Sequence, residues 1–150
     1  LADLMGELFH RLPEGPPLYP TDLATTQTER FFVSEVVREK LLERTRNELP
    51  YTTGVVVDLF EESERLLHVE AVIYVERMSQ KGIVIGKGGS MIRSVGQAAR
   101  EELEKVLGIK IYLGVRVKVH PRWRDDPSVL IEMEPGTADL SGFGEPTDEN

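Results

Sequence analysis

The chain has 150 residues, of which 40% are hydrophobic and 29% charged, with a formal net charge of −8 and no cysteine. This length suits one ordinary domain with a core and is too short for two large ones. The absence of an apolar run of about 18 residues excludes a membrane-spanning helix. The lack of cysteine excludes disulfides and thiolate metal sites and fits a reducing cytoplasm.

The negative net charge conceals a strongly positive region. Residues 1–80 include 8 basic and 15 acidic residues, whereas residues 81–124 include 10 basic and 3 acidic residues, a local net charge of +7. Eight acids and no Lys or Arg follow residue 124. Because the local field matters more than total charge for phosphate binding, residues 81–124 remain a candidate for contact with an anionic partner.

The N-terminal third predicts two helices and a linker. Leucines recur every four residues from Leu4 to Leu12, which indicates a short helix over residues 1–12. Four prolines and a glycine in residues 11–22 indicate an extended linker. The pattern Thr-Gln-Thr-Glu at 26–29 is typical of a capping box and opens a second helix, which is expected to end near Leu49, just before a proline.

The rest of the core predicts a sheet covered by helices. Alternating apolar residues indicate strands over 55–60 and 67–76, joined by a charged hairpin link, and a third strand over 110–120. Between them, apolar residues spaced three or four apart predict a helix over 91–107, ended by Gly108. These periods together predict a two-layer α+β domain. The chain after Trp123 is expected to be loosely ordered.

The stretch GIVIGKGGS (82–90) is not a nucleotide-binding loop of either common kind. A Walker A loop fails because Gly82 and Gly86 stand one residue too close, and because Lys87 is followed by Gly88 where a hydroxyl should hold Mg²⁺. A dinucleotide fingerprint counted from Gly86 requires glycine at the position of Met91. The motif that does fit is G-x-x-G at residues 86–89.

The glycines at 86, 88 and 89 allow a phosphate chain to approach the backbone closely, since no Cβ intervenes. The backbone N–H groups of Gly89 and Ser90, at the predicted helix start, are expected to favour an anion, and Lys87 adds a positive charge. A flexible turn without function is the plainer interpretation. The apolar residues before the motif and the helix after it favour the functional one.

Residues 80–85, just before the motif, also look helical. The order helix–strand–strand–helix–helix–strand around the motif therefore resembles a type II KH domain, in which a GxxG loop clamps about four nucleotides of backbone. The resemblance extends further. The stretches RLPEGPPLYPTD, FFVSEVVREKLLERTRNELPY, YVERMSQKGIVIGKGGSMI and VKVHPRWRDDP are similar to the C-terminal part of the Era family of bacterial ribosome-assembly GTPases. This resemblance implies an α+β fold with a three-stranded sheet and helices packed on one face.

The resemblance also implies a domain organisation. Residues 1–12 would end a preceding GTPase domain, 13–26 would be a linker, 27–124 the type II KH domain and 125–150 an acidic C-terminal tail. The phosphate loop and guanine-reading motifs of the GTPase are absent from this sequence, so the chain is expected not to hydrolyse GTP and to hold no cofactor. GTP and Mg²⁺ would belong to the preceding domain.

The function implied is binding of single-stranded RNA near the 3′ end of 16S rRNA, in assembly of the 30S ribosomal subunit. The resemblance places the protein in the cytoplasm and permits a peripheral association with the inner membrane. The alternative is a protein-interaction domain that docks on ribosomal proteins or on the parent GTPase domain. An enzyme is a distant third, because no catalytic constellation is present. The three histidines lack metal-ligand spacing, so no metal site is expected.

In the groove that the resemblance implies, residues 83–85 supply an apolar floor, residues 86–89 grip the RNA backbone, and three cations meet phosphates. The candidate RNA-binding residues are Lys81, Ile83, Val84, Ile85, Gly86, Lys87, Gly88, Gly89, Ser90 and Arg93. The plainer alternatives are that the isoleucines are core residues and that Arg93 is a solvated charge.

Two further features have open interpretations. Val72 and Tyr74, on the outward face of the second strand, reach the groove in one reading. The cluster Arg122-Trp123-Arg124 either stacks on a base or packs Trp123 against the domain.

Overall fold

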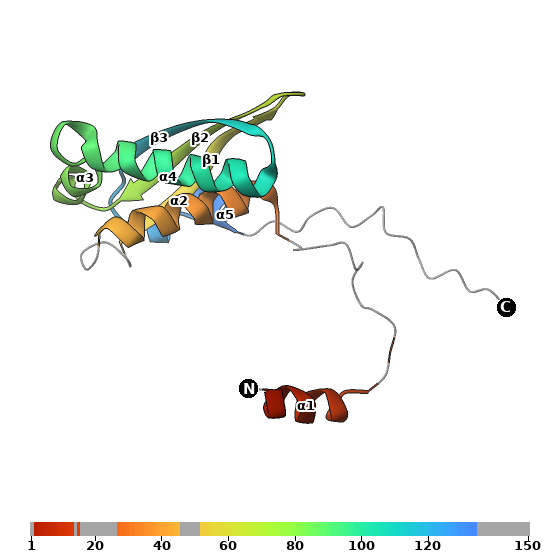
Figure 1. The fold of residues 1–150 in the computed structure, drawn as a ribbon. Helices are drawn as coiled ribbons and strands as arrows, with labels where there is room; N and C mark the ends of the chain where they lie inside the picture. The colour runs from red at the N-terminus through yellow and green to blue at the C-terminus, as the bar shows by residue number, and fades with distance from the viewer. Residues whose placement is uncertain (1, 14, 16–26, 46–51, 135–150) are drawn as a thin grey trace. The chain divides into compact units, whose positions relative to one another are not determined.

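The computed structural model describes residues 2–13, 15, 27–45 and 52–134, which form two separate units. The first unit contributes one described helix, and the second contains the remaining elements (Figure 1). In chain order they are α1 (Ala2–Arg11), α2 (Glu29–Thr45), β1 (Thr53–Glu62), β2 (Leu66–Val75), α3 (Met78–Ile85), the 3-10 turn η1 (Lys87–Gly89), α4 (Ser90–Leu107), β3 (Lys110–Val119), the 3-10 turn η2 (Trp123–Asp125) and α5 (Pro127–Met133).

Helix α1 confirms the prediction from leucine spacing, and its apolar side chains are exposed. Its other positions include the charged residues Glu7 and Arg11, whose side chains lie 3.5 Å apart. None of its residues is buried. The exposed apolar residues are Leu4, Met5, Leu8, Phe9 and, just beyond the helix, Leu12.

The described strands form one sheet in the order β1-β2-β3. β1 and β2 are antiparallel, and their hairpin is closed by Ser63, whose N–H and hydroxyl both donate to the carbonyl of Leu66 at 3.0 and 2.8 Å. β3 runs parallel to β2. A parallel pair needs a long crossover, which α3, η1 and α4 supply. The glycine motif therefore lies inside the crossover.

Helices α2 and α4 cover one face of the sheet, as Figure 1 shows, and confirm the predicted layer. Valines of α2 and the inward residues of all three strands share the main core with Val84, Val95, Ala99 and Leu103. Lys40 joins the two helices at its edge, with its Nζ 2.5 Å from Glu102 of α4 and 2.8 Å from Glu39. The hydrogen bond to Glu102 raises the pKa of Lys40 above its ordinary value.

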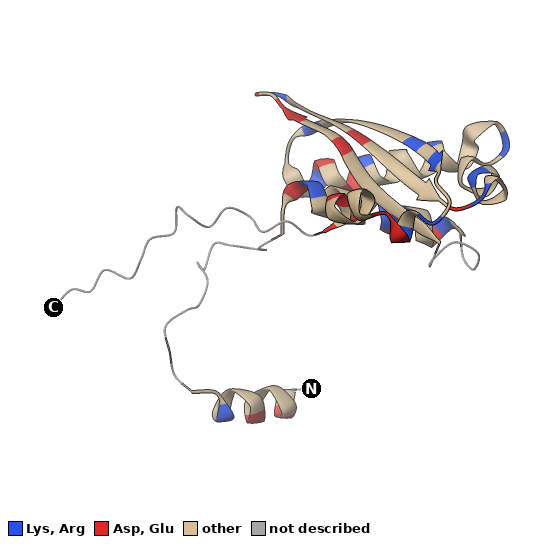
Figure 2. Cartoon of the chain, turned by 180° about the vertical axis from the view of Figure 1, so that it is seen from behind, with Lys and Arg blue, Asp and Glu red and all other residues tan. Residues whose placement is uncertain are grey.

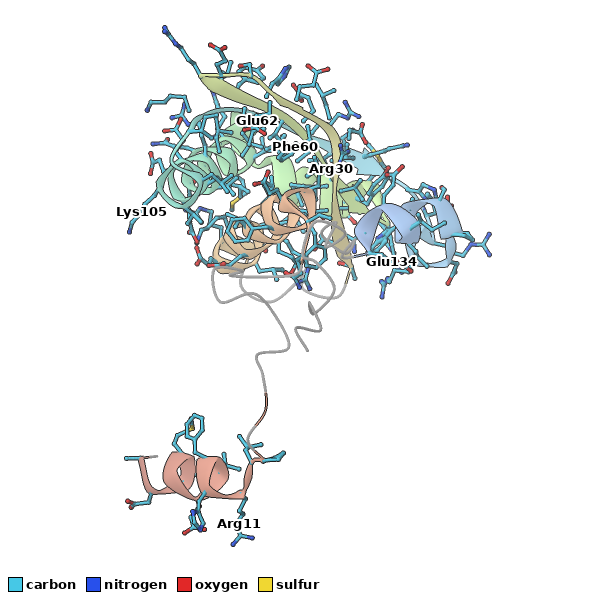
Figure 3. All side chains as sticks on the ribbon, turned by 90° about the vertical axis from the view of Figure 1, so that its right-hand side faces the viewer. Arg11, Arg30, Phe60, Glu62, Lys105 and Glu134 are labelled. Carbon is cyan, nitrogen blue, oxygen red and sulfur yellow. The ribbon has the colours of Figure 1, made fainter. Side chains whose placement is uncertain are left out.

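Helix α2 begins slightly later than the capping box suggested. The hydroxyl of Thr28 accepts the N–H of Phe31 at 3.3 Å, so Thr28 takes the capping role. Arg30, labelled in Figure 3, donates to the carbonyl of Val57 at 2.6 Å, where the β1–β2 register shifts. The predicted end of this helix near Leu49 lies outside the described residues.

The expectation of a loosely ordered chain after Trp123 is wrong for residues 127–133. Helix α5 starts at the N-cap Asp126, whose carboxylate accepts the N–H of Ser128 at 3.0 Å and its hydroxyl at 2.7 Å. These bonds lower the pKa of Asp126, and His120 Nε2, 2.9 Å away, adds to the effect. Val129 is buried, which anchors the helix.

Helix α5 and Trp123 cover part of the second face of the sheet. Trp123 is 6% exposed and packs with Val56, Val72, Tyr74 and Val129 in a second, smaller core. Its indole N–H donates to the carbonyl of Thr52 at 3.3 Å. Burial raises the pKa of Tyr74. Of the two readings of the Arg-Trp-Arg cluster, packing of the indole against the domain is the correct one.

Candidate nucleic-acid interface

The glycine loop (residues 86–89) adopts a conformation that ordinary residues avoid. Gly86, Gly88 and Gly89 have φ of 71°, 60° and 77°. Positive φ is costly for a residue with a Cβ and nearly free for glycine. The loop thus connects α3 to α4 without regular helical backbone, and its sequence is rich in glycine because the geometry requires it.

The glycines of the loop differ in what surrounds them. A Cβ on Gly86 would lie 2.7 Å from the Cβ of Met91, so Gly86 is needed for close packing on α4 as well as for its φ. A Cβ on Gly88 would meet nothing within 4 Å. Gly88 and Lys87 are both exposed. The tip of the loop therefore exposes the backbone of Gly88, next to the exposed ammonium group of Lys87.

The two amides expected to bind an anion are already paired. The N–H of Gly89 donates to the carbonyl of Gly86 at 3.1 Å, and the N–H of Ser90 donates to the carbonyl of Lys87. The expectation that these amides bind phosphate is therefore wrong. They close the loop, and the charge on Lys87 and the open approach to Gly88 remain as its anion-attracting features.

The loop is also held from the side by Arg93. Its Nε donates to the carbonyl of Gly89 at 3.2 Å, and its Nη2 donates to the carbonyl of Gly88. The sequence predicted this side chain as a phosphate contact, whereas in the structure it contacts protein.

The predicted residues of α3 divide into surface and core. Ile83 is 38% exposed, and Lys81 and Ile85 are half-buried. Val84 is 0% exposed and belongs to the main core, so it cannot line a groove as predicted. The reason is the helical period, which turns the middle residue of an Ile-Val-Ile run toward the sheet.

An open groove runs between α4 and β3, beginning at Arg93 beside the glycine loop. We call it the α4–β3 groove. Its apolar lining comes from both elements, and its polar lining comes mainly from α4 and from the start of β3. The lining residues are Leu66, Ile92, Arg93, Gly96, Gln97, Arg100, Glu104, Lys110, Ile111, Tyr112, Leu113 and Val115.

Of the residues predicted for the site, only Arg93 lines this groove. Lys81, Ile83 and Ile85 lie on α3, which precedes the loop. Val72 and Tyr74 lie under Trp123 on the other face of the sheet, so the idea that they reach the groove is wrong.

Apart from Arg93, the α4 and β3 residues of the groove were not among the predicted site residues. Helical spacing could have placed Ile92, Gly96 and Arg100 on one side of α4, because they are four residues apart. No sequence signal pairs that side with Leu113 and Val115 of β3.

Charge is graded along the domain. In Figure 2, Lys and Arg colour the end that carries α3 and the glycine loop, and Asp and Glu colour the β1–β2 hairpin. Glu104 lies at the far end of the α4–β3 groove, where it accepts the N–H of Ile111 at 3.1 Å and the ammonium of Lys110 at 3.2 Å. The bond from Ile111 lowers the pKa of Glu104, so it is anionic at neutral pH. The carboxylate of Glu104 is thus offset by the ammonium group of Lys110.

In residues 2–13, 15, 27–45 and 52–134, no three His, Asp or Glu side chains are grouped so that they could hold a metal ion. None of the helices in those ranges combines the length and the apolar character that crossing a bilayer requires.

Residues 48–124 match the KH domain family. A sheet with one parallel and one antiparallel pair, helices on one face and a GxxG loop in the crossover define the same class of protein. The chain belongs to the KH domain family.

Within that family the chain is similar to the KH-containing part of GTPase Era. It is 47% identical to GTPase Era of Nostoc sp. over 133 residues, which are 89% of this chain and 41% of that protein. It is 43% identical to GTPase Era of Thermotoga maritima over 131 residues, 87% of this chain and 44% of that protein. The chain therefore spans less than half the length of these relatives.

Two solved structures share the fold. One is an Aquifex aeolicus Era variant bound to GDP.AlF4-, with a TM-score of 0.81 and 36% identity. The other is Era in complex with MgGDPNP and nucleotides 1506–1542 of 16S ribosomal RNA, with a TM-score of 0.82 and 36% identity. Each match covers 88% of this chain and 45% of the solved one.

Proposed function

We propose that this chain binds single-stranded RNA through the glycine loop and the α4–β3 groove. The observation that carries the proposal is the loop tip, where the bare backbone of Gly88 stands next to exposed Lys87, while Arg93, which bonds to the loop, lines the α4–β3 groove. Membership of the KH family supports it. A relative solved with nucleotides of 16S rRNA favours the 3′ region of that RNA as the target, in assembly of the small subunit.

Each part of the site has a separate task in this proposal. Lys87 neutralises a phosphate, and Gly88 lets the sugar–phosphate chain lie against the protein backbone. Ile92, Leu113 and Val115 offer an apolar surface for unstacked bases, and hydrogen bonds to base edges supply the specificity. The remaining residues predicted from the sequence, Lys81, Ile83 and Ile85, stay candidates for contact on the α3 side of the loop.

The first test is a binding screen of single-stranded RNA 12-mers tiled along 16S rRNA. Oligonucleotides from the 3′ end are expected to bind most tightly. Lys87→Gln is expected to weaken binding because one phosphate contact is lost. It is also expected to lower, by about 0.7, the magnitude of the salt slope, which is the slope of the logarithm of the binding constant against the logarithm of the salt concentration. The measurement is fluorescence anisotropy over a range of salt concentrations.

Lys105→Gln is the matched control for that test. Lys105 is exposed in the last turn of α4, and Figure 3 labels it. It carries the same charge as Lys87 but lies at the C-terminal end of α4, away from the glycine loop, so the salt slope is expected to stay unchanged. Equal slopes for the Lys87 and Lys105 variants would rule out a phosphate contact at Lys87.

Gly96 provides a second test, directed at the groove. A Cβ there would touch the Val115 methyl at an ordinary 3.6 Å, so Ala fits. Gly96→Ala is expected to stabilise the domain by about 0.5–1 kcal/mol, because Ala is the better helix former. The added methyl also narrows the groove, so RNA affinity is expected to fall by about 3- to 10-fold. Thermal unfolding and anisotropy measure the two effects, and an increase in both stability and affinity would argue against RNA in the groove.

We further propose that α1 belongs to a preceding GTPase domain, with residues 13–26 as the linker, 27–124 as the KH domain and 125–150 as an acidic tail. The exposed apolar side chains of α1 support this assignment, since an amphipathic helix buries such a face against a partner. The candidate second function, docking on another protein or domain, rests on the same face. GTP and Mg²⁺ would bind the preceding domain, this chain would not hydrolyse GTP, and the whole would act in the cytoplasm.

A further inference from the structure

The guanidinium of Arg93 turns back along α4 onto the glycine loop. It reaches two successive carbonyls, those of Gly88 and Gly89, through Nη2 and Nε. Both carbonyls belong to residues in the left-handed region. Gly89 is also the N-cap of α4, and no side chain caps the helix there. Arg93 therefore bonds to the loop at two glycines, the residues with the greatest backbone conformational freedom.

We propose that Arg93 is a positioning residue that holds the glycine loop in its RNA-binding conformation and does not itself contact a phosphate. This inference rests on the proposed RNA binding. Glycines lose the most conformational freedom on ordering, so a loop fixed in advance binds more tightly than one fixed by the ligand. The bonds of Arg93 keep the tip, with Gly88 and Lys87, presented outward.

The chemistry of the side chain supports this role. Nε and Nη2 of a guanidinium lie on one edge of a rigid plane, which suits two neighbouring carbonyl acceptors. A lysine carries the same charge as a compact point and lacks that fork. A cation near a helix N-terminus is also unfavourable by the helix dipole. The hydrogen bonds to the two carbonyls offset this cost, which explains how a cation is accommodated at residue 93.

The test compares Arg93→Lys and Arg93→Gln with Lys87→Gln, using the 16S 3′-end 12-mer over a range of salt concentrations. Both Arg93 variants are expected to weaken binding about tenfold with an unchanged salt slope, because preorganisation is lost and no phosphate contact is. Lys87→Gln is expected to lower the slope by about 0.7. If Arg93→Gln lowers the slope by that amount and Arg93→Lys restores it, Arg93 is a phosphate contact and the proposal is overturned.

A second readout needs no RNA. Hydrogen exchange of the Gly89 and Ser90 amides, both bonded within the loop, is measured by NMR on the full 150-residue chain. Exchange is expected to accelerate about tenfold in both Arg93 variants and to stay unchanged in Lys87→Gln. Unchanged exchange in the Arg93 variants overturns the positioning role. If the unmutated chain binds no 12-mer, the proposed function fails, and the exchange result still decides whether Arg93 orders the loop.

Discussion

A chain carrying both Lys87→Asp and Gly88→Asp is expected to lose binding to the 16S 3′-end 12-mer by about 100-fold or more. The change removes a cation and places two carboxylates where the phosphates would lie, and juxtaposed like charges cost several kcal/mol. Fluorescence anisotropy at about 0.1 M salt measures the loss. At that ionic strength the Debye length is about 10 Å, so contacts at the loop remain effective.

The fold is expected to survive this double substitution. Gly88 has φ 60° and ψ 24°, in the left-handed region that Asp tolerates better than most residues, and its Cβ would meet no atom within 4 Å. The cost in unfolding free energy is therefore about 1 kcal/mol. A native circular dichroism spectrum and a similar unfolding midpoint verify that lost binding is not lost structure.

The matched control is Lys105→Asp with Gly108→Asp at the other end of α4. Gly108 has φ 70°, and a Cβ there also meets nothing within 4 Å. Lys105 and Gly108 are both exposed. This variant has the same charge change and a comparable backbone strain, and it is expected to bind normally. Equal losses in the two variants would show that net charge alone, and not the glycine loop, governs binding.

Trp123→Ala is expected to destabilise the domain by about 3–5 kcal/mol, the usual cost of emptying a buried aromatic site. The indole supports the second core between the sheet and α5, and its removal exposes Val72 and Tyr74. Urea denaturation followed by circular dichroism measures the change. Fluorescence is unsuitable, because this is the only tryptophan in the chain. A loss below about 1 kcal/mol would contradict a structural role.

Trp123→Phe separates packing from RNA stacking. It keeps an aromatic ring in the site and loses the N–H bond to the Thr52 carbonyl, so a smaller loss of about 1–2 kcal/mol is expected. RNA affinity is expected to be unchanged, because the indole is buried on the face of the sheet opposite α2 and α4. A fall in affinity without a fall in stability would restore the stacking interpretation.

Most of the fold was predictable because its elements have clear periods. Apolar residues occupy every second position of β3 and every third or fourth position of α4, and Gly108 takes the left-handed C-cap that its position suggested. Helix α5 was not predicted, because its seven residues follow a cluster of acids and resemble a tail. A signal was present in Asp126-Pro127, since Asp at the N-cap with Pro at the next position is a typical helix start.

The site was predictable only in part. The glycine motif marks its own backbone geometry, so residues 86–89 could be found from sequence. The direction in which a side chain or a backbone amide points could not be predicted from the sequence. Arg93 turned onto the loop, Val84 turned into the core, and the amides of Gly89 and Ser90 paired with loop carbonyls. These outcomes depend on how α3, α4 and β3 pack, which local patterns do not encode.

An NMR titration of the isotope-labelled chain with the 16S 3′-end 12-mer shows directly where the RNA lies. We expect the amide chemical-shift changes to concentrate in residues 86–89, along α4 from Ile92 to Arg100, and in β3 from Ile111 to Val115. The chemical shifts of the amides around Trp123 and in α5 are expected to stay unchanged. Shifts centred on Trp123 and α5, with residues 86–89 unmoved, would contradict the claim that the glycine loop and the α4–β3 groove hold the RNA.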